Sequence, residues 1–266
     1  MFMKRLIPCF VIALVLTGCP APESIQKEIP PPPTTGKKPL APDIVVKVAS
    51  LNISKYSKKI ERDDILKLSS QIKQDSIDIL TIEGITRYPE IKTRVDIVEE
   101  LASAAEMRKI FGETIMLTGR QNGNAVFSVY PIRSSEQTPY DRLHSANFEG
   151  TLQAVIDCGV RELVVVSTLV PEKASLNDLS IVSSTLGTFN NLYINRPIII
   201  SGNLPKSDDL RALAMYDGTQ QLRTEDAPCF WFSKNGSLKL ISQRTGHTVF
   251  GTISVVRIGI FRQQQP

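Results

Sequence analysis

Short apolar runs that stop at Gly, Asn or Pro recur along this chain, and they restrict its fold more than any other feature. One of them, PIIISGNLP, begins at Pro197 and breaks at Gly202 and Pro205. A run of about four to eight apolar residues between turn formers is typical of a buried strand. By this pattern the sequence predicts further strands over 43–53, 77–85, 114–119, 123–132, 229–233, 238–242 and 251–261, and a hairpin over 149–171.

Segments with helical spacing separate these strands. Ile65, Leu68 and Ile72 recur every three or four residues, which predicts a helix over about 62–73 with Asp63 or Asp64 as its cap. The amphipathic stretch 90–111 predicts a second helix, and 177–193 predicts a third. Turns are expected at 121–123 and near 158–159. Strands joined in hairpins, with helices between them, favour an α+β fold or layered sandwich over a purely parallel sheet.

The composition excludes some classes of function. The chain has 266 residues, 42% of them hydrophobic and 22% charged, which fits one large or two small globular domains. The net charge of +4 and the lack of basic runs give no strong signal for nucleic-acid binding. His144 and His247 are the two histidines. A solitary loop histidine is usually solvated, so a mechanism that needs a histidine pair is strongly constrained.

The amino end carries features of an export signal. Lys4 and Arg5 precede an apolar stretch, 6–16, which is shorter than the roughly 20 residues needed to span a bilayer. The stretch ends in Leu-Thr-Gly-Cys, which resembles the bacterial lipobox and implies lipidation at Cys19. An ordinary cleaved signal peptide is the alternative. The sequence therefore predicts a lipoprotein signal peptide over 1–18, a Pro-rich tether over 19–42 and a folded domain over 43–262.

The lipobox resemblance also implies a location. Acyl chains on Cys19, palmitate among them, would anchor the protein stably where a single chain would not. We expect a lipid-anchored protein of the bacterial cell envelope that faces the periplasm, or the cell surface. Pro20 is not the Asp of an inner-membrane retention signal, which favours the outer membrane in a cell with two membranes. Cys158 and Cys229 are left as unmodified thiols, and the sequence leaves open whether they pair.

Six segments together resemble one family of phosphoesterases. They are VASLNI, DILTIEGI, GNAVFSVYPI, LVVVSTLVP, PIIISGNLP and GTISVVRIGIF, of which GNAVFSVYPI is the most specific. In order and spacing, over 44–261, they resemble the endonuclease/exonuclease/phosphatase superfamily. The resemblance implies a four-layered α/β sandwich, with two packed mixed β-sheets flanked by helices. It also implies descent from metal-dependent phosphodiesterases and phosphatases.

The resemblance assigns the candidate site residues. Asn52 and Glu83 stand at the family's asparagine and metal-binding glutamate, and Asn203 stands where the family has an aspartate. Other usual polar positions are lost: the family's histidine falls on Leu169, or on Thr168 with a one-residue shift, its loop asparagine on Pro205, and its terminal aspartate and histidine on Thr252 and Ile253.

Phosphodiester hydrolysis by this design needs a divalent ion, a carboxylate that activates water, and donors for the developing charge. Glu83 alone could offer Mg²⁺ one weak ligand, whereas the amide of Asn203 is no general base. We therefore predict a pseudoenzyme without a cofactor, in which Asn52, Glu83 and Asn203 are vestigial. It would bind the membrane through its lipid, with an envelope protein as a candidate partner.

Two alternatives stay open at this stage. One is a working Mg²⁺-dependent phosphodiesterase or phosphatase whose site is rebuilt from Glu83, Asn52, Asn203 and His144. The other is a purely structural envelope lipoprotein, because a fold does not fix a function. The structural interpretations are that Glu83 is a strand-end carboxylate bonded to its neighbours and that Asn52 bridges strand ends.

Overall fold

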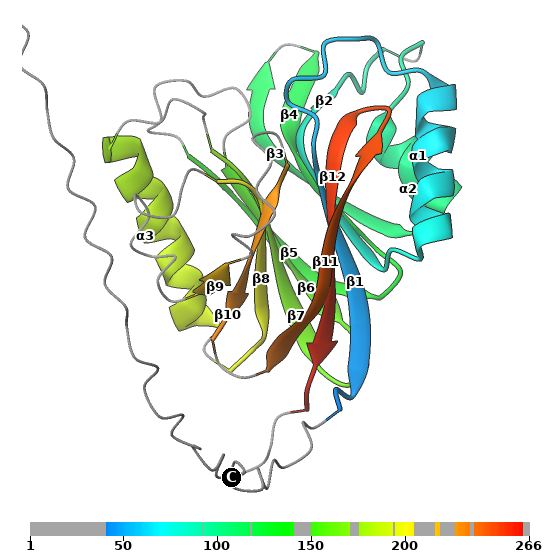
Figure 1. Cartoon of the computed structure of the whole chain (residues 1–266). Helices are drawn as coiled ribbons and strands as arrows, with labels where there is room; N and C mark the ends of the chain where they lie inside the picture. Colours follow the sequence, from blue (N-terminus) through cyan, green and yellow to red (C-terminus); the bar gives the residue numbers. More distant parts are fainter. Residues whose placement is uncertain are drawn as a thin grey trace, which may run out of the picture. The chain divides into compact units, whose positions relative to one another are not determined.

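The computed structural model describes residues 41–91, 93–117, 119–140, 150–170, 176–193, 195–204, 216–218, 227–234 and 237–262. Within this part, two six-stranded mixed sheets pack face to face, with helices on their outer faces (Figure 1). The four layers are α1 with α2, the first sheet, the second sheet, and α3. This is the expected four-layered α/β sandwich, and the prediction of the fold class is confirmed.

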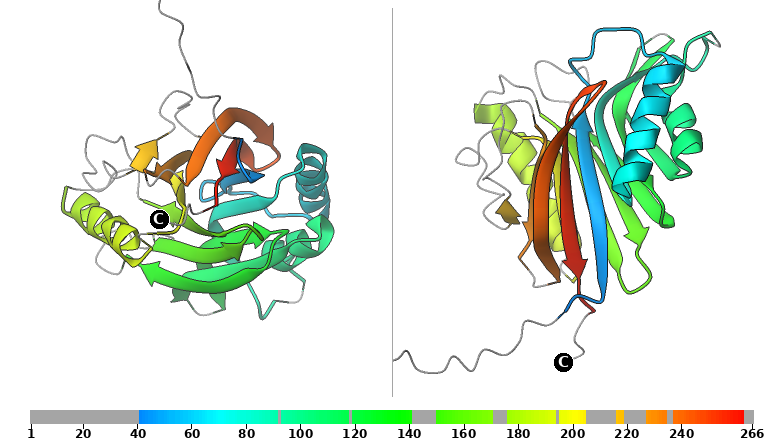
Figure 2. Two further views of the ribbon diagram at one scale, coloured as in Figure 1. Left: turned by 90° about the horizontal axis from the view of Figure 1, so that it is seen from below. Right: turned by 45° about the vertical axis from the view of Figure 1, so that its right-hand side comes forward.

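The first sheet has the strand order β11-β12-β1-β2-β4-β3. Within it β1 and β2 are parallel, and the other neighbours are antiparallel. Helices α1 and α2 follow β1 and β2 along the chain and cover the outer face (Figure 2). The elements are β1 (Ile44–Asn52), α1 (Arg62–Asp75), β2 (Ile79–Arg87), α2 (Ile97–Ala105), β3 (Arg108–Leu117), β4 (Arg120–Ser128), β11 (Leu238–Thr248) and β12 (Gly251–Ile260).

The second sheet has the strand order β5-β6-β7-β8-β10-β9. Only β7 and β8 are parallel among its described pairs, and α3 lies between them in the sequence and on the outer face. The elements are β5 (Ile132–Pro139), β6 (Gly150–Asp157), β7 (Glu162–Leu169), α3 (Leu176–Leu192), β8 (Ile198–Asn203), β9 (Tyr216–Gly218) and β10 (Cys229–Ser233).

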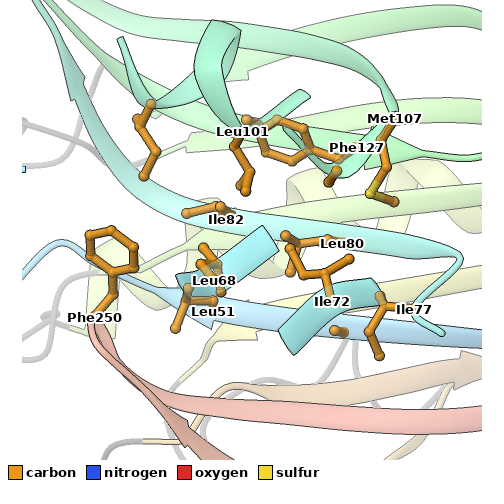
Figure 3. Close-up of a cluster of buried hydrophobic side chains, with 14 of the residues drawn as sticks. Leu51, Leu68, Ile72, Ile77, Leu80, Ile82, Leu101, Met107, Phe127 and Phe250 are labelled. Carbon is orange, nitrogen blue, oxygen red and sulfur yellow. The ribbon is translucent and has the colours of Figure 1, made fainter. Parts of the chain in front are cut away.

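Three apolar clusters fill the spaces between the layers. One joins α1 and α2 to the first sheet and includes Leu68, Leu101 and Phe127 (Figure 3). A second joins α3 to the second sheet. The third lies between the sheets and includes Ile79 and Val165. Because successive strand residues point to opposite faces, both sheets are apolar on two faces, which explains the nearly continuous apolar runs in the sequence.

Several element boundaries differ from the sequence prediction. The second helix covers only Ile97–Ala105 instead of 90–111. Asp96 caps it by accepting bonds from two backbone amides, and Glu106 ends it in the left-handed conformation at φ 59°. The residues after Met107 had helical spacing, yet they form β3, because pairing with β4 outweighs local propensity.

The first hairpin turn was also misplaced. Asn122 and Gly123 lie inside β4 and pair with both neighbouring strands. The connection runs instead between Leu117 and Arg120, with Gly119 at φ 70°. Strand β5 was missed altogether, because IRSSEQTP is polar and carries no apolar alternation. The hairpin of β6 and β7, helix α3 and strands β8, β10 and β12 form where the sequence predicted them, whereas β11 continues past residue 242 to Thr248 and so includes His247, which was expected in a loop.

Cys158 and Cys229 are free and buried, and they belong to different apolar clusters, so the structure settles that they do not pair. None of the described helices combines the length and the hydrophobicity that a membrane span requires. Residues 1–18, Cys19 and the tether up to residue 40 lie outside the described part.

Candidate functional site

A layer of hydroxyl side chains lies between the two sheets. It consists of Ser50, Thr81, Ser167, Ser201 and Ser254, all of them buried. The Thr81 Oγ1 and Ser201 Oγ atoms lie 2.8 Å apart and join the sheets directly. The apolar cluster between the sheets therefore gives way to a polar layer toward the end of the sandwich where the β1–α1 loop lies, at the top of Figure 1.

Glu83 lies on β2 beside this layer, at a bulge in the pairing of β2 with β4. A bulge places two residues opposite one and changes the direction of a side chain. Here Glu83 and Gly84 face Asn124, whose Oδ1 accepts a bond of 3.2 Å from the Gly84 amide. Gly84 has φ 75°, and a Cβ there would lie 2.4 Å from the Ser54 Cβ, so the bulge requires glycine.

Hydroxyl groups from both sheets surround the Glu83 carboxyl. Ser50 Oγ donates toward both carboxyl oxygens, at 3.2 and 3.1 Å, and Ser167 Oγ donates to Oε1 at 2.9 Å. The Glu83 residue is 0% exposed. The carboxyl group is therefore sealed within the sandwich. A catalytic carboxylate, by contrast, would have to contact a bound ion or a water molecule.

Burial raises the pKa of Glu83 from its ordinary value of 4.5 to about 7, because removal from water disfavours the charged form. The hydroxyls of Ser167, Thr81 and Ser50 act in the opposite direction by stabilising the carboxylate. A backbone hydrogen bond at Glu83 adds to their effect. Burial outweighs these bonds, so the acid is partly protonated near neutral pH.

The strand register brings the other family positions to the same end of the sandwich. Asn52 is the partner of Glu83 across β1 and β2, and Leu169 is the partner of Asn203 across β7 and β8. Asn52 Oδ1 accepts a bond of 2.9 Å from the Ser54 amide, which fixes the start of the loop after β1. Asn52 thus orders its own loop by a local bond, which differs from the bridge between strand ends that the sequence suggested.

The position of the family's histidine is occupied by an apolar side chain. Leu169 is buried and lies two residues after Ser167, so it shares the face that looks toward the first sheet. Thr168 points the other way, and its Oγ1 lies 2.9 Å from the buried Tyr140 hydroxyl. The alternative alignment on Thr168 therefore places no polar group beside Glu83.

The terminal pair of the family motif is divided between two faces of β12. Ile253 is buried in the cluster beneath α1 and α2, so it points away from the space between the sheets. Thr252 is half-buried and pairs with His247 of β11, an exposed residue. Pro205 and His144 lie outside the described residues.

These residues do not fit a divalent ion. Mg²⁺ takes oxygen ligands in near-octahedral geometry and keeps several waters, which needs room and negative charge. In the described ranges, no group of three or more His, Cys, Asp or Glu side chains could hold a metal ion. Glu83 offers one sealed carboxyl group, whose oxygens already accept hydrogen bonds from the Ser50 and Ser167 hydroxyls.

Sequence reasoning missed the hydroxyl layer, although the sequence carries a signal for it. A Ser or Thr stands two residues before each family position on four strands: Ser50 before Asn52, Thr81 before Glu83, Ser167 before Leu169, and Ser201 before Asn203. Residues two apart in a strand share a face. The repeated spacing could therefore have predicted one hydroxyl layer beneath the site.

No protein-family model matches the sequence, and no curated protein matches it significantly. Solved structures do match the fold. An endonuclease/exonuclease/phosphatase from Beutenbergia cavernae DSM 12333 is 13% identical with a TM-score of 0.61, over 82% of this chain and 72% of that one. D. rerio TDP2 complexed with single strand DNA product is 10% identical with a TM-score of 0.63, over 82% and 100%.

An endonuclease/exonuclease/phosphatase family protein from Leptotrichia buccalis C-1013-b is 11% identical, with a TM-score of 0.56, over 81% of this chain and 100% of that one. The structural similarity establishes the fold, whereas sequence identities this low support no statement about activity. The fold expected from the six sequence segments is thereby confirmed.

Proposed function

Because this chain has the endonuclease/exonuclease/phosphatase fold, we propose that it is a non-catalytic form of that fold, which acts by binding and is held at the cell envelope by a lipid on Cys19. One observation carries the loss of catalysis: Glu83 is fully buried and its carboxyl oxygens accept bonds from Ser50 and Ser167. A carboxylate in this setting reaches neither a metal ion nor an attacking water.

The replacements around Glu83 support the same proposal. Removing one donor to a developing charge typically costs about a hundred- to a thousand-fold in rate. Leu169 supplies no donor, Ile253 faces the helices, and Asn203 is never ionised. Groups that act as a unit do not lose activity additively, yet little is left when several are absent. The domain is thus proposed to need no cofactor.

The proposed anchor rests on the amino-terminal sequence. A basic start, a short apolar stretch and a lipobox precede a Pro-rich segment that would hold the domain away from the bilayer. We propose that the domain faces the periplasm from the outer membrane, or faces outward at the cell surface, and that an envelope protein is its partner.

Catalytic loss is tested with the full chain in detergent and a generic phosphodiester reporter, with and without Mg²⁺ or Mn²⁺. We expect no metal-dependent turnover above buffer from the wild type or from Glu83→Gln. Metal-dependent turnover by the wild type that Glu83→Gln abolishes would show a working phosphodiesterase and refute the proposal.

The anchor is tested by mass spectrometry of the amino-terminal peptide and by membrane fractionation. We expect acyl chains on Cys19 in the wild type, and release of Cys19→Ala from the membrane fraction. An unmodified Cys19 in a protein cut elsewhere would identify an ordinary signal peptide.

A further inference from the structure

A pocket of about 380 Å³ opens at the end of the first sheet where β1 and β2 lead into their helices. We call it the Gly84 pocket. Its volume falls within the range of small-molecule sites. Its lining combines cationic, aromatic and apolar side chains, among them Lys58, Lys59, Ile60, Tyr88, Arg94 and Val95.

The charges of the Gly84 pocket have one sign. Lys58, Lys59 and Arg94 line it, and none of its described lining residues carries a carboxyl group. Two acids border the pocket: Glu61 pairs with Lys59 at 3.1 Å, with both side chains more than half exposed, and Asp64 accepts a bond from the Tyr56 hydroxyl. Exposed pairs of this kind contribute little and exchange readily, so Lys59 is available to an incoming anion.

The Gly84 pocket also has flat and apolar walls. The Arg94 guanidinium lies 3.9 Å from the centre of the Tyr88 ring, which keeps the charge beside an aromatic face. Ile60 and Val95 pack against the helix-side core and present apolar surface. A ligand that fits this lining combines negative charge with an apolar body.

The floor of the Gly84 pocket is fixed before any ligand arrives. The Ile53 amide donates to the Glu83 carbonyl at 2.9 Å, and Asn52 Oδ1 holds the Ser54 amide. The Tyr56 ring packs edge-on against Phe250, with 5.0 Å between ring centres. A site that is already ordered loses less conformational freedom on binding, which favours affinity for a small ligand.

We propose that the Gly84 pocket binds a small organic anion, a carboxylate or a phosphate monoester, that carries an aromatic or other flat apolar body. Arg94 and Lys58 contact the anionic group, and Tyr88 contacts the body. Asn52 orders the loop that forms the floor. The inference rests on the proposed function in one respect: the anion is bound and is not cleaved.

The test uses the full chain and four probes in calorimetric or ligand-observed NMR titrations. Phenyl phosphate and benzoate combine charge with a ring, inorganic phosphate has charge alone, and benzyl alcohol has a ring alone. We expect a Kd of about 1 mM or tighter for one of the ring-bearing anions, with the two single-feature probes about tenfold weaker or worse. The tighter of the two anions identifies the head group.

Variants locate the binding. Arg94→Gln and Lys58→Gln each should raise the Kd of the bound anion by about threefold or more. Tyr88→Leu should weaken the ring-bearing anion and leave inorganic phosphate unchanged. Lys239→Gln is the matched control, because it removes one exposed positive charge at the far end of the first sheet, where β12 pairs with the start of β1.

The proposal is overturned if neither ring-bearing anion binds at up to about 10 mM, or if Arg94→Gln and Lys58→Gln bind like Lys239→Gln. Hydrolysis of phenyl phosphate with Mg²⁺ is a separate outcome. It would refute the proposed loss of catalysis. The effects of Arg94→Gln and Lys58→Gln on the Kd would still support anion binding in the Gly84 pocket, so the two proposals can fail independently.

Discussion

Replacing Glu83 with glutamine is expected to make the protein more stable than the wild type at alkaline pH and not at acidic pH. The buried carboxyl has a pKa of about 7, against an ordinary value of 4.5. Between these values the folded protein keeps a proton that the unfolded chain releases, so stability falls as pH rises. At about 1.4 kcal/mol per pKa unit, the rise from 4.5 to about 7 corresponds to about 3 kcal/mol.

Glutamine has nearly the same shape and carries no charge, so it avoids this penalty. Its amide can still accept from Ser50 or Ser167 and donate to the other hydroxyl. The stability gain over the wild type should therefore be small below about pH 4.5, rise between about pH 4.5 and 7, and level off above, at up to about 3 kcal/mol.

The assay is chemical denaturation of wild type and Glu83→Gln from acidic to alkaline pH, with Glu90→Gln as an exposed control. The difference in the free energy of unfolding between the two proteins cancels the contribution of all other titrating groups. A difference that does not change with pH would mean that Glu83 titrates normally. The opposite result is that the free energy of unfolding of the wild type increases relative to that of Glu83→Gln as pH rises, above all when Mg²⁺ is added. It would mean that a cation stabilises the carboxylate, and it would refute the sealed site.

Three further substitutions test the same structure by denaturation. Ser167→Ala should cost about 1–3 kcal/mol, because it removes the shorter of the two hydroxyl bonds to the buried Glu83 Oε1 and leaves only the longer bond from Ser50; a neutral result would mean that water replaces the hydroxyl. Gly84→Ala should cost about 2 kcal/mol or more, since φ is 75° and the new Cβ would meet Ser54; Gly119→Ala, with a similar φ but open space, is its control. Leu101→Ala should cost about 2–5 kcal/mol by opening a cavity in the apolar cluster beneath α1 and α2 (Figure 3), and a cost below about 1 kcal/mol would mean that this cluster collapses to fill the cavity.

Much of the architecture could be predicted from local pattern. The apolar runs that became β1, β2, β7 and β8 are buried on both faces over most of their length, so most of their residues had to be apolar and the signal was strong. The polar strand β5 had no such signal. The residues after α2 could have continued the helix, and only their pairing with β4 made them a strand.

The sequence by itself determined which chemical groups the site can contain: Asn52 and Glu83 at their family positions, and Leu169, Pro205 and Ile253 where polar groups are usual. It could not determine whether Glu83 is exposed. That depends on Ser167, which lies 84 residues away in the sequence and on the other sheet. Burial, and with it the pKa of Glu83, arises only when the two sheets pack together and exclude water, so the tertiary structure alone decided that this carboxyl is sealed.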